Sequence, residues 1–326
     1  MNKTAVWIIA KKEYRDALKN VLFIVLLAFL LFLTAVSLSV AGFDFQSQVG
    51  QYHNALAQLQ ALSQTGAVLE KPQYFPLQML RGTIEYLEII GAIIGLILGY
   101  VSIAKEKGNN TLQLLLTRPV SRWSFIMGKI LGNSLLLLSM LGLIIIFIVV
   151  AITGIGQVMF THLELVKLLL AFGFSYIYLL FFYCLATVLA LVFRNLPNAL
   201  IFGFVIWLLI VLIIPQIGDT MDPDNQIPGG FFNHMHMTTA QQRGVIAQFK
   251  TYETLRNVLE ESSIEKHYER LTFAVLGIKN IYNDKGLSLI FQDKWGDLTW
   301  IGSYSLAGIL LVYVAFNNKH ILEKSA

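Results

Sequence analysis

The sequence is poor in charged residues. Only 13% of its 326 residues are Asp, Glu, Lys or Arg, whereas 56% are hydrophobic and the mean hydropathy is +0.64. Water-soluble domains carry about 25% charged residues. The net charge of +4 is small, and the Lys and Arg residues are scattered between apolar runs instead of forming one stripe. Lipid is therefore the expected surrounding of much of the chain, and nucleic acid is not an expected partner.

The sequence also lacks the residues that several kinds of site require. A single cysteine, Cys184, excludes a disulfide framework and a CxxC site within one chain. Gly128-Lys129 is not a nucleotide-binding loop, because Trp123 stands where glycine is needed and Ile130 where a hydroxyl should bind magnesium. No H-E-x-x-H occurs, and the apolar runs contain almost no ionisable residues. We expect no cofactor and no catalytic residue in this chain.

Six apolar runs predict an all-α integral membrane protein. A bilayer core about 30 Å thick requires roughly 20 apolar helical residues. Five runs meet this length without any charge: Val21 to Ala41, Ile130 to Ile155, Leu168 to Phe193, Leu200 to Ile217 and Leu298 to Phe316. The sixth, Ile89 to Ala104, spans only if its helix begins near Thr83, with Glu85 and Glu88 at its outer end. Pro197 and Pro215 are expected to mark helix ends.

The distribution of positive charge predicts the orientation. The segments 1–20, 105–129, 194–199 and 317–326 contain 13 of the 24 Lys and Arg residues in about 61 residues, and the opposite loops contain the other 11 in more than twice that length. Cytoplasmic loops are enriched in Lys and Arg. We expect both termini in the cytoplasm, a multi-pass protein of the cytoplasmic membrane, and segments 42–82, 156–167 and 218–297 outside.

The N-terminal segment 1–20 is predicted to be a cytoplasmic amphipathic helix. Val6, Ile9, Ala10, Glu13 and Ala17 fall near one side of such a helix, and the cations Lys11, Lys12, Arg15 and Lys19 fall largely on the other. A basic helix before a first span can lie in the membrane interface as an elbow that also contacts a partner. Alternatively, its cations only orient the first span.

Segment 105–129 is predicted to be a helix, a break and a second helix. Pro119 ends a short leucine-rich helix, and Ser121 can cap the helix that follows. The segment resembles the intracellular loop of ABC-2 type permeases, in particular a group associated with multicopper-enzyme maturation. The matching residues are Glu106, Thr111, Leu112, Leu114 to Leu116, Thr117, Pro119, Val120, Ser121, Arg122, Gly128 and Lys129. Asn110 departs from the pattern, which usually has glycine there.

The resemblance implies the permease subunit of an ATP-binding-cassette (ABC) exporter, with residues 1–326 as one ABC-2 type transmembrane domain. It also implies two copies of a cytoplasmic ATPase that bind ATP and magnesium, and a second permease copy or homologue. Loop 105–129 would dock on the ATPase as a coupling loop. The residues implied in that contact are Glu106, Thr111, Leu112, Leu115, Leu116, Pro119, Ser121 and Arg122. The alternatives are a non-transporting anchor, immunity or assembly subunit, and an unrecognised membrane enzyme.

The long outer loop 218–297 is predicted to form a small extracytoplasmic subdomain between the fifth and sixth spans. Its segment 239–268 has the periodicity of one amphipathic helix, with an apolar face that includes Tyr252, Leu255 and Val258. The face could pack on its own loop, lie on the membrane or contact cargo, and an extracytoplasmic accessory protein could bind the loop. The cluster His234, Met235, His236 and Met237 offers copper ligands if it is a strand; otherwise it is a polar turn.

Overall fold

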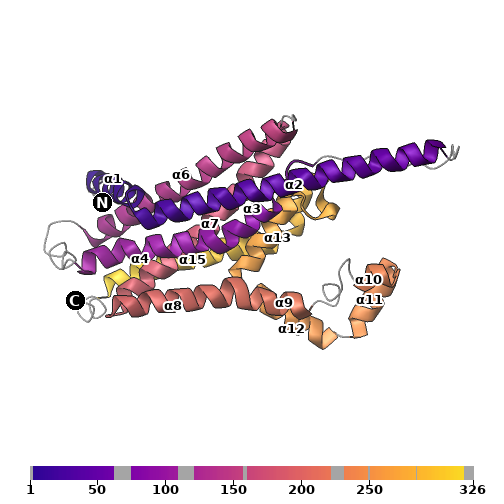
Figure 1. Ribbon diagram of the computed structural model, residues 1–326. Helices are drawn as coiled ribbons and strands as arrows, with labels where there is room; N and C mark the ends of the chain where they lie inside the picture. The colour runs from indigo at the N-terminus through magenta and orange to yellow at the C-terminus, as the bar shows by residue number, and fades with distance from the viewer. Residues whose placement is uncertain are drawn as a thin grey trace.

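The computed structural model describes residues 3–61, 75–108, 121–156, 160–221, 231–248, 250–283 and 285–318, and within these ranges every regular element is helical. The elements form an elongated bundle (Figure 1). Six helices are long and apolar enough to cross a membrane: Val21–Gln58, Gln78–Gly108, Arg122–Gly154, His162–Val192, Leu196–Met221 and Trp295–Asn317. Each contains one predicted span, so the all-α, six-span prediction is confirmed.

The helices in chain order begin with α1 (Lys3–Leu18), α2 (Val21–Ala61), η1 (Gln78–Leu80), α3 (Arg81–Tyr86), η2 (Leu87–Gly91), α4 (Ala92–Gly108), α6 (Arg122–Gly156) and α7 (His162–Val192). They continue with α8 (Leu196–Leu208), η3 (Leu209–Ile213), α9 (Ile214–Met221), α10 (Phe231–His234), α11 (Thr239–Gln248), α12 (Lys250–Glu261), α13 (Ile264–Leu276), η5 (Asn280–Tyr282), α14 (Leu287–Asp293) and α15 (Trp295–Asn317). Helix α1 and the last turns of α15 lie at the same end of the bundle (Figure 1), called here the termini end.

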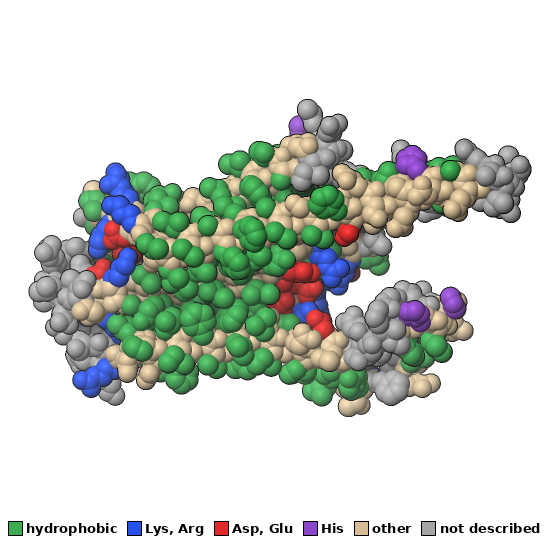
Figure 2. All heavy atoms as spheres, viewed as in Figure 1, with side chains coloured by type: hydrophobic (Ala, Val, Ile, Leu, Met, Phe, Trp, Pro, Cys, Tyr) green, Lys and Arg blue, Asp and Glu red, His purple; other side chains and the backbone are tan. Residues whose placement is uncertain are grey.

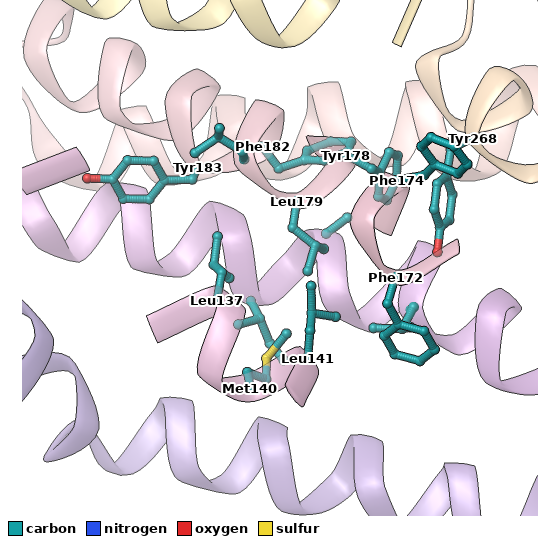
Figure 3. Packing of buried hydrophobic residues seen from close by; sticks show 14 of the residues in the cluster. Leu137, Met140, Leu141, Phe172, Phe174, Tyr178, Leu179, Phe182, Tyr183 and Tyr268 are labelled. Atoms are coloured by element: carbon teal, nitrogen blue, oxygen red, sulfur yellow. The ribbon is translucent and has the colours of Figure 1, made fainter. Parts of the chain in front are cut away.

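Helix α7 is the centre of the bundle, and α4, α6, α8, α13 and α15 all contact it. It begins at a capping box, in which Thr161 and Glu164 exchange side-chain and backbone hydrogen bonds. Its inner side is aromatic: Tyr178, Phe182 and Tyr183 are fully buried and face residues of α6 and α13 (Figure 3). The ring of Tyr178 stacks on that of Tyr268 from α13, with centroids 4.5 Å apart.

Glycines bring α4 against α7. Gly91, Gly95 and Gly99 recur every four residues, so they share one face of the helix run. A Cβ atom on Gly95 would lie 2.7 Å from the Leu179 carbonyl oxygen, and one on Gly99 would overlap the Tyr183 carbonyl. Small residues allow this close backbone approach between helices in lipid. Leucine at either position would force the two helices apart.

Two π-helical turns, η2 and η3, interrupt the spans, and the prediction that Pro215 ends a helix after η3 is wrong. Pro215 does not end the fifth span, because helical structure continues to Met221. Since proline has no N–H, a carbonyl in the preceding π-helical turn η3 loses its helical donor. The Ile210 carbonyl there accepts a hydrogen bond of 2.8 Å from the Ser263 hydroxyl instead. Pro197, in contrast, stands in the first turn of α8, as predicted.

In the predicted outer segment 42–82, the first helix is longer than the apolar run that predicts its span. Helix α2 does not end near Ala41 but continues to Ala61, and it projects beyond the bundle at the end opposite the termini (Figure 1). Forty-one residues at about 1.5 Å each are roughly twice as long as a bilayer core is thick. The hydropathy of the span marks where the lipid-compatible part ends, but not where the helix ends.

The predicted outer segment 218–297 does not contain one amphipathic helix over 239–268. It is divided into α11, α12 and α13, and Ser263 caps α13 by accepting a hydrogen bond from the Glu265 N–H. Helix α13 packs against the spans α7 and α15 and is buried, whereas Tyr252, Leu255 and Val258 of α12 are exposed. The predicted packing of this apolar face on its own loop is therefore not observed at those three residues.

Three polar side chains, His267 and Glu265 of α13 and Glu88 of η2, are buried in the bundle. His267 is 2% exposed, and its two ring nitrogens lie 2.7 Å from an Asp297 carboxylate oxygen and 2.9 Å from the Glu261 carbonyl oxygen. Glu88 of η2 is also buried, so it does not occupy a solvated helix end. The Glu265 carboxyl is buried as well. Burial, only partly offset by the neighbouring Lys266 ammonium, raises the pKa of Glu265 from 4.5 to about 8.

Replacing Gly99 with alanine should lower the stability of the bundle, because the added methyl group has no space beside Tyr183. Overpacking of this kind costs about 1–3 kcal/mol. Gly142→Ala in α6 is the matched control, because no atom lies within 4 Å of the position of its added Cβ. Thermal unfolding of detergent-purified protein measures both variants. Equal melting temperatures for the two variants would contradict the proposed close contact.

Stability should fall as the pH rises from 4.5 to 8, in part through Glu265. The native state favours the protonated carboxyl, so its contribution is complete below the unfolded-state pKa and is lost as the pH passes the native pKa of about 8. Glu265→Gln cannot ionise and should flatten the pH dependence of the melting temperature over this window. An unchanged pH profile in this variant would show that the native carboxyl is not held protonated.

Candidate functional site

The predicted coupling loop connects α4 to α6. Five of its eight predicted contact residues (Thr111, Leu112, Leu115, Leu116 and Pro119) lie outside the described residues. The other three flank the loop: Glu106 is in the last turns of α4, and Ser121 and Arg122 begin α6. Ser121 caps α6 as predicted, because its hydroxyl accepts a hydrogen bond of 3.2 Å from the Ser124 N–H. Arg122 is half-buried.

A buried ion network lies at the root of this loop. The Lys129 ammonium, 3% exposed, is 2.7 Å from a carboxylate oxygen of Glu13, 2.8 Å from the Ser102 carbonyl oxygen and 3.4 Å from a carboxylate oxygen of Glu106. An ammonium group has three hydrogens to donate, and these acceptors use all three. Lys12, which is largely exposed, lies 3.4 Å from the same Glu106 oxygen. One cation thus joins three helices, α1, α4 and α6.

Helix α1 reaches Lys129 because α6 has glycine where the two helices meet. A Cβ atom on Gly128 would lie 2.7 Å from the Ile9 Cβ, and one on Gly132 would lie 2.8 Å from the Glu13 Cβ. The buried side of α1 consists of Val6, Ala10, Glu13 and Ala17, and the predicted cations Lys11, Lys12, Arg15 and Lys19 are all exposed. Helix α1 is therefore amphipathic, and its cytoplasmic position and elbow role stay predictions. Trp7 and Ile8 are also exposed at its surface, as expected for a helix lying in the membrane interface.

Two further contacts attach the network to α7. The Lys107 ammonium donates to the Leu191 and Phe193 carbonyl oxygens, at 2.9 and 3.1 Å, where α7 ends. Those carbonyls have no helical donor of their own. The Asn133 amide donates to the Lys129 carbonyl oxygen and, at 3.4 Å, to the Tyr183 hydroxyl. Both sides of the coupling loop are therefore fixed to the central helix.

Sequence reasoning identified Glu106 but not its partners. Glu13 had one visible signal, since it is an acidic residue on the apolar side of an amphipathic segment. Lys129 was noticed only as the end of the family pattern. Glu13 is a carboxylate on an apolar face, and Lys129 is a lysine at the start of a span. Each needs a buried counter-charge, and this requirement could have predicted that they pair with one another. Glu106 itself is 6% exposed and points into the network.

The candidate copper ligands do not lie on a strand. His234 ends α10, and Met235, His236 and Met237 follow in a turn where His236 has a positive φ of 49°. The geometry that would place both histidines on one face is absent. Among the described residues, no group of three or more His, Cys, Asp or Glu side chains could hold a metal ion. The polar-turn interpretation describes this segment.

Replacing Lys129 with methionine should destabilise the protein strongly, because the buried Glu13 carboxylate would lose the ammonium beside it and Glu106 would retain the largely exposed Lys12 in place of a buried cation. Breaking a buried ion pair from one side costs about 3–5 kcal/mol. Adding Glu13→Gln to Lys129→Met should recover part of that loss. Thermal unfolding of the single and double variants measures the coupling, and Lys11→Met, an exposed cation on the same α1, is the control. A double variant that loses the full sum of the single losses would contradict direct pairing.

The network holds α1 together with α4 and α6, the helices on the two sides of segment 109–120. No curated protein matches the chain. A family model described as ABC-2 family transporter protein matches residues 7–321, which is nearly the whole sequence and includes most of α1, segment 105–129 and all six candidate spans. The chain therefore belongs to the ABC-2 family of transporters, as a membrane subunit of the kind that works with an ABC ATPase.

Proposed function

We propose that this protein is the permease subunit of an ABC exporter that moves its substrate outward with energy from ATP hydrolysed by a separate chain. Membership of the ABC-2 family supports the transport role. The observation that carries the proposal is the bridge from Lys129 to Glu13 and Glu106. It attaches α1, α4 and α6 to one another at the coupling loop, on the positively charged side of the bundle.

The bridge gives the loop a means of acting on the spans. A force on segment 109–120 reaches α4 and α6 together, because Lys129 joins them directly behind the loop. Helix α4 transmits it to α7 along the glycine contact, where packed helices move as units instead of bending. Helix α1 moves with them along the membrane interface. ATPase closure would thus shift several spans at once.

Residues of the coupling loop have different roles in this proposal. Glu106 is buried, so we propose that it holds the root of the loop and does not contact the ATPase. The docking residues are then Arg122, which is half-buried, and the leucine-rich segment with Leu112, Leu115 and Leu116. The full assembly in this proposal contains two permeases and two ATPase subunits, and both termini of each permease are cytoplasmic.

Docking and transmission should separate in two variants. The pair Leu115→Glu and Leu116→Glu should abolish co-purification of the partner ABC ATPase, because charge replaces the apolar contact. Glu106→Gln should keep the ATPase bound but reduce ATP-driven movement. Lys105→Gln, an exposed neighbour of Glu106, is the control and should behave as the native chain.

The movement can be measured with a nitroxide label at Lys11→Cys, because Lys11 is exposed and the only native cysteine, Cys184, is buried. In the complex, the distance between labels on the two permeases should change when ATP is trapped, and Glu106→Gln should shrink that change several-fold. A chain that never co-purifies with an ATPase would favour an anchor or assembly subunit. Catalytic turnover by the chain alone would favour a membrane enzyme.

A further inference from the structure

A charged cleft of about 750 Å³ lies at the end of the bundle opposite the termini. Its walls come from four helices: α3, α9, α12 and α13. Gly218 lets α9 and α12 approach closely beside the cleft, since a Cβ there would lie 2.7 Å from the Glu260 side chain. In Figure 2 the blue and red side chains gather here, at the edge of the green apolar face. The cleft is separate from the ion network at the coupling loop.

Positive charge exceeds negative charge in this cleft by two. The lining cations are Arg81, Arg256, Lys266, Arg270 and Lys279, and the lining carboxylates are Asp219, Glu260 and Glu269. The carboxylates are already engaged. Glu260 pairs with Arg270, and Lys266 lies 3.2 Å from Asp219 and 2.8 Å from Glu269. The buried Glu265 carboxyl beside them adds no negative charge at neutral pH, because burial raises its pKa to about 8.

Two of the cations are available to a ligand. Lys279 is exposed and has no carboxylate partner within the ranges that the structure describes. Among the described residues, the ion-pair partner of Arg81 is Glu85, at 2.9 Å in an i,i+4 contact with side chains 67% and 44% exposed, and the Arg81 guanidinium also lies 5.9 Å from the centroid of the Phe273 ring. Exposed pairs of this kind contribute at most about 1 kcal/mol, so an anion can displace Glu85. A guanidinium and an ammonium together form a suitable set of donors for phosphate.

The apolar residues beside the cleft indicate what is attached to the anionic group of the ligand. The α9 residues that line it continue directly from η3 and α8, whose exposed side chains include Leu209, Leu212 and Ile213 of η3 and Leu208 of α8. These apolar residues belong to a candidate membrane span. A molecule with an anionic head in the cleft would therefore lay an acyl chain along η3 and α8. A free phosphate ion would not use this apolar surface.

We propose that the cleft binds the phosphate head of an anionic amphiphile, with Arg81 and Lys279 as its ligating residues and the apolar surface of η3 and α8 as the seat of its chain. The inference concerns binding at this cleft and does not depend on the direction of transport or on the ATPase. Excess positive charge favours a phosphate monoester or diester over a zwitterionic head, whose cationic part would meet Arg256 and Arg270.

Binding of a fluorescent phosphatidic acid to the purified full-length protein in neutral detergent tests the proposal. Arg81→Gln together with Lys279→Gln should weaken the affinity about tenfold or more, because two charge-assisted hydrogen bonds are lost. Lys250→Gln, an exposed cation of α12 outside the cleft, should leave it unchanged. Added salt should weaken binding to the native protein and affect the double variant less.

Two competitors distinguish the parts of the ligand. Diacylglycerol, which has the chains without the phosphate, should not displace the probe, and inorganic phosphate should displace it only at far higher concentration than unlabelled phosphatidic acid. Equal potency of inorganic phosphate and phosphatidic acid would overturn the amphiphile assignment. An unchanged affinity in the double variant would overturn the site. Arg81 and Lys279 are exposed, and an unchanged melting temperature for the double variant verifies that it folds.

Discussion

At Gly95 and Gly99 the backbones of α4 and α7 approach so closely that no side chain fits between them. The rest of the bundle is arranged around this contact. It fixes the rotation of α4, and with it the direction of Ser102 and Glu106 one and two turns later. It also places Tyr183 where its hydroxyl meets Asn133 of α6, one turn from Lys129. The buried ammonium thus finds acceptors on α4 because two glycines let α4 and α7 touch, and an acceptor on α1 because Gly128 and Gly132 let α1 approach α6.

The same helical run carries residues of both polar sites. From Arg81 to Gly108 it passes from the charged cleft, through the π-helical turn at Glu88, to the ion network at the coupling loop. Along that path it lies against α7, and Tyr178 of α7 donates a hydrogen bond of 3.0 Å to the Glu88 carbonyl oxygen. A shift of this run at one end is therefore felt at the other.

The two sites use charge differently. At the coupling loop, charges are buried and each is matched, so the network resists separation of its helices and costs much to break from one side. In the cleft, charges are partly exposed and cations are in excess, so an anionic ligand can neutralise the remaining positive charge. Burial with full pairing favours rigidity, whereas exposure with an imbalance favours binding.

The amino-acid sequence was sufficient to predict that this protein lies in a membrane, how many spans it has and to which family it belongs. Runs of about 20 apolar residues cross a bilayer only as helices, so hydropathy predicted six spans, and the pattern from Glu106 to Lys129 predicted the family. Helix ends were less predictable, because α2 continues beyond lipid and a π-helical turn carries the fifth span past Pro215. Only the tertiary structure decided that Glu13 and Lys129 meet, that α13 enters the bundle, and that Arg81 joins residues 200 positions away in one cleft. Those contacts depend on how helices rotate and pack against one another, and local periodicity does not record it.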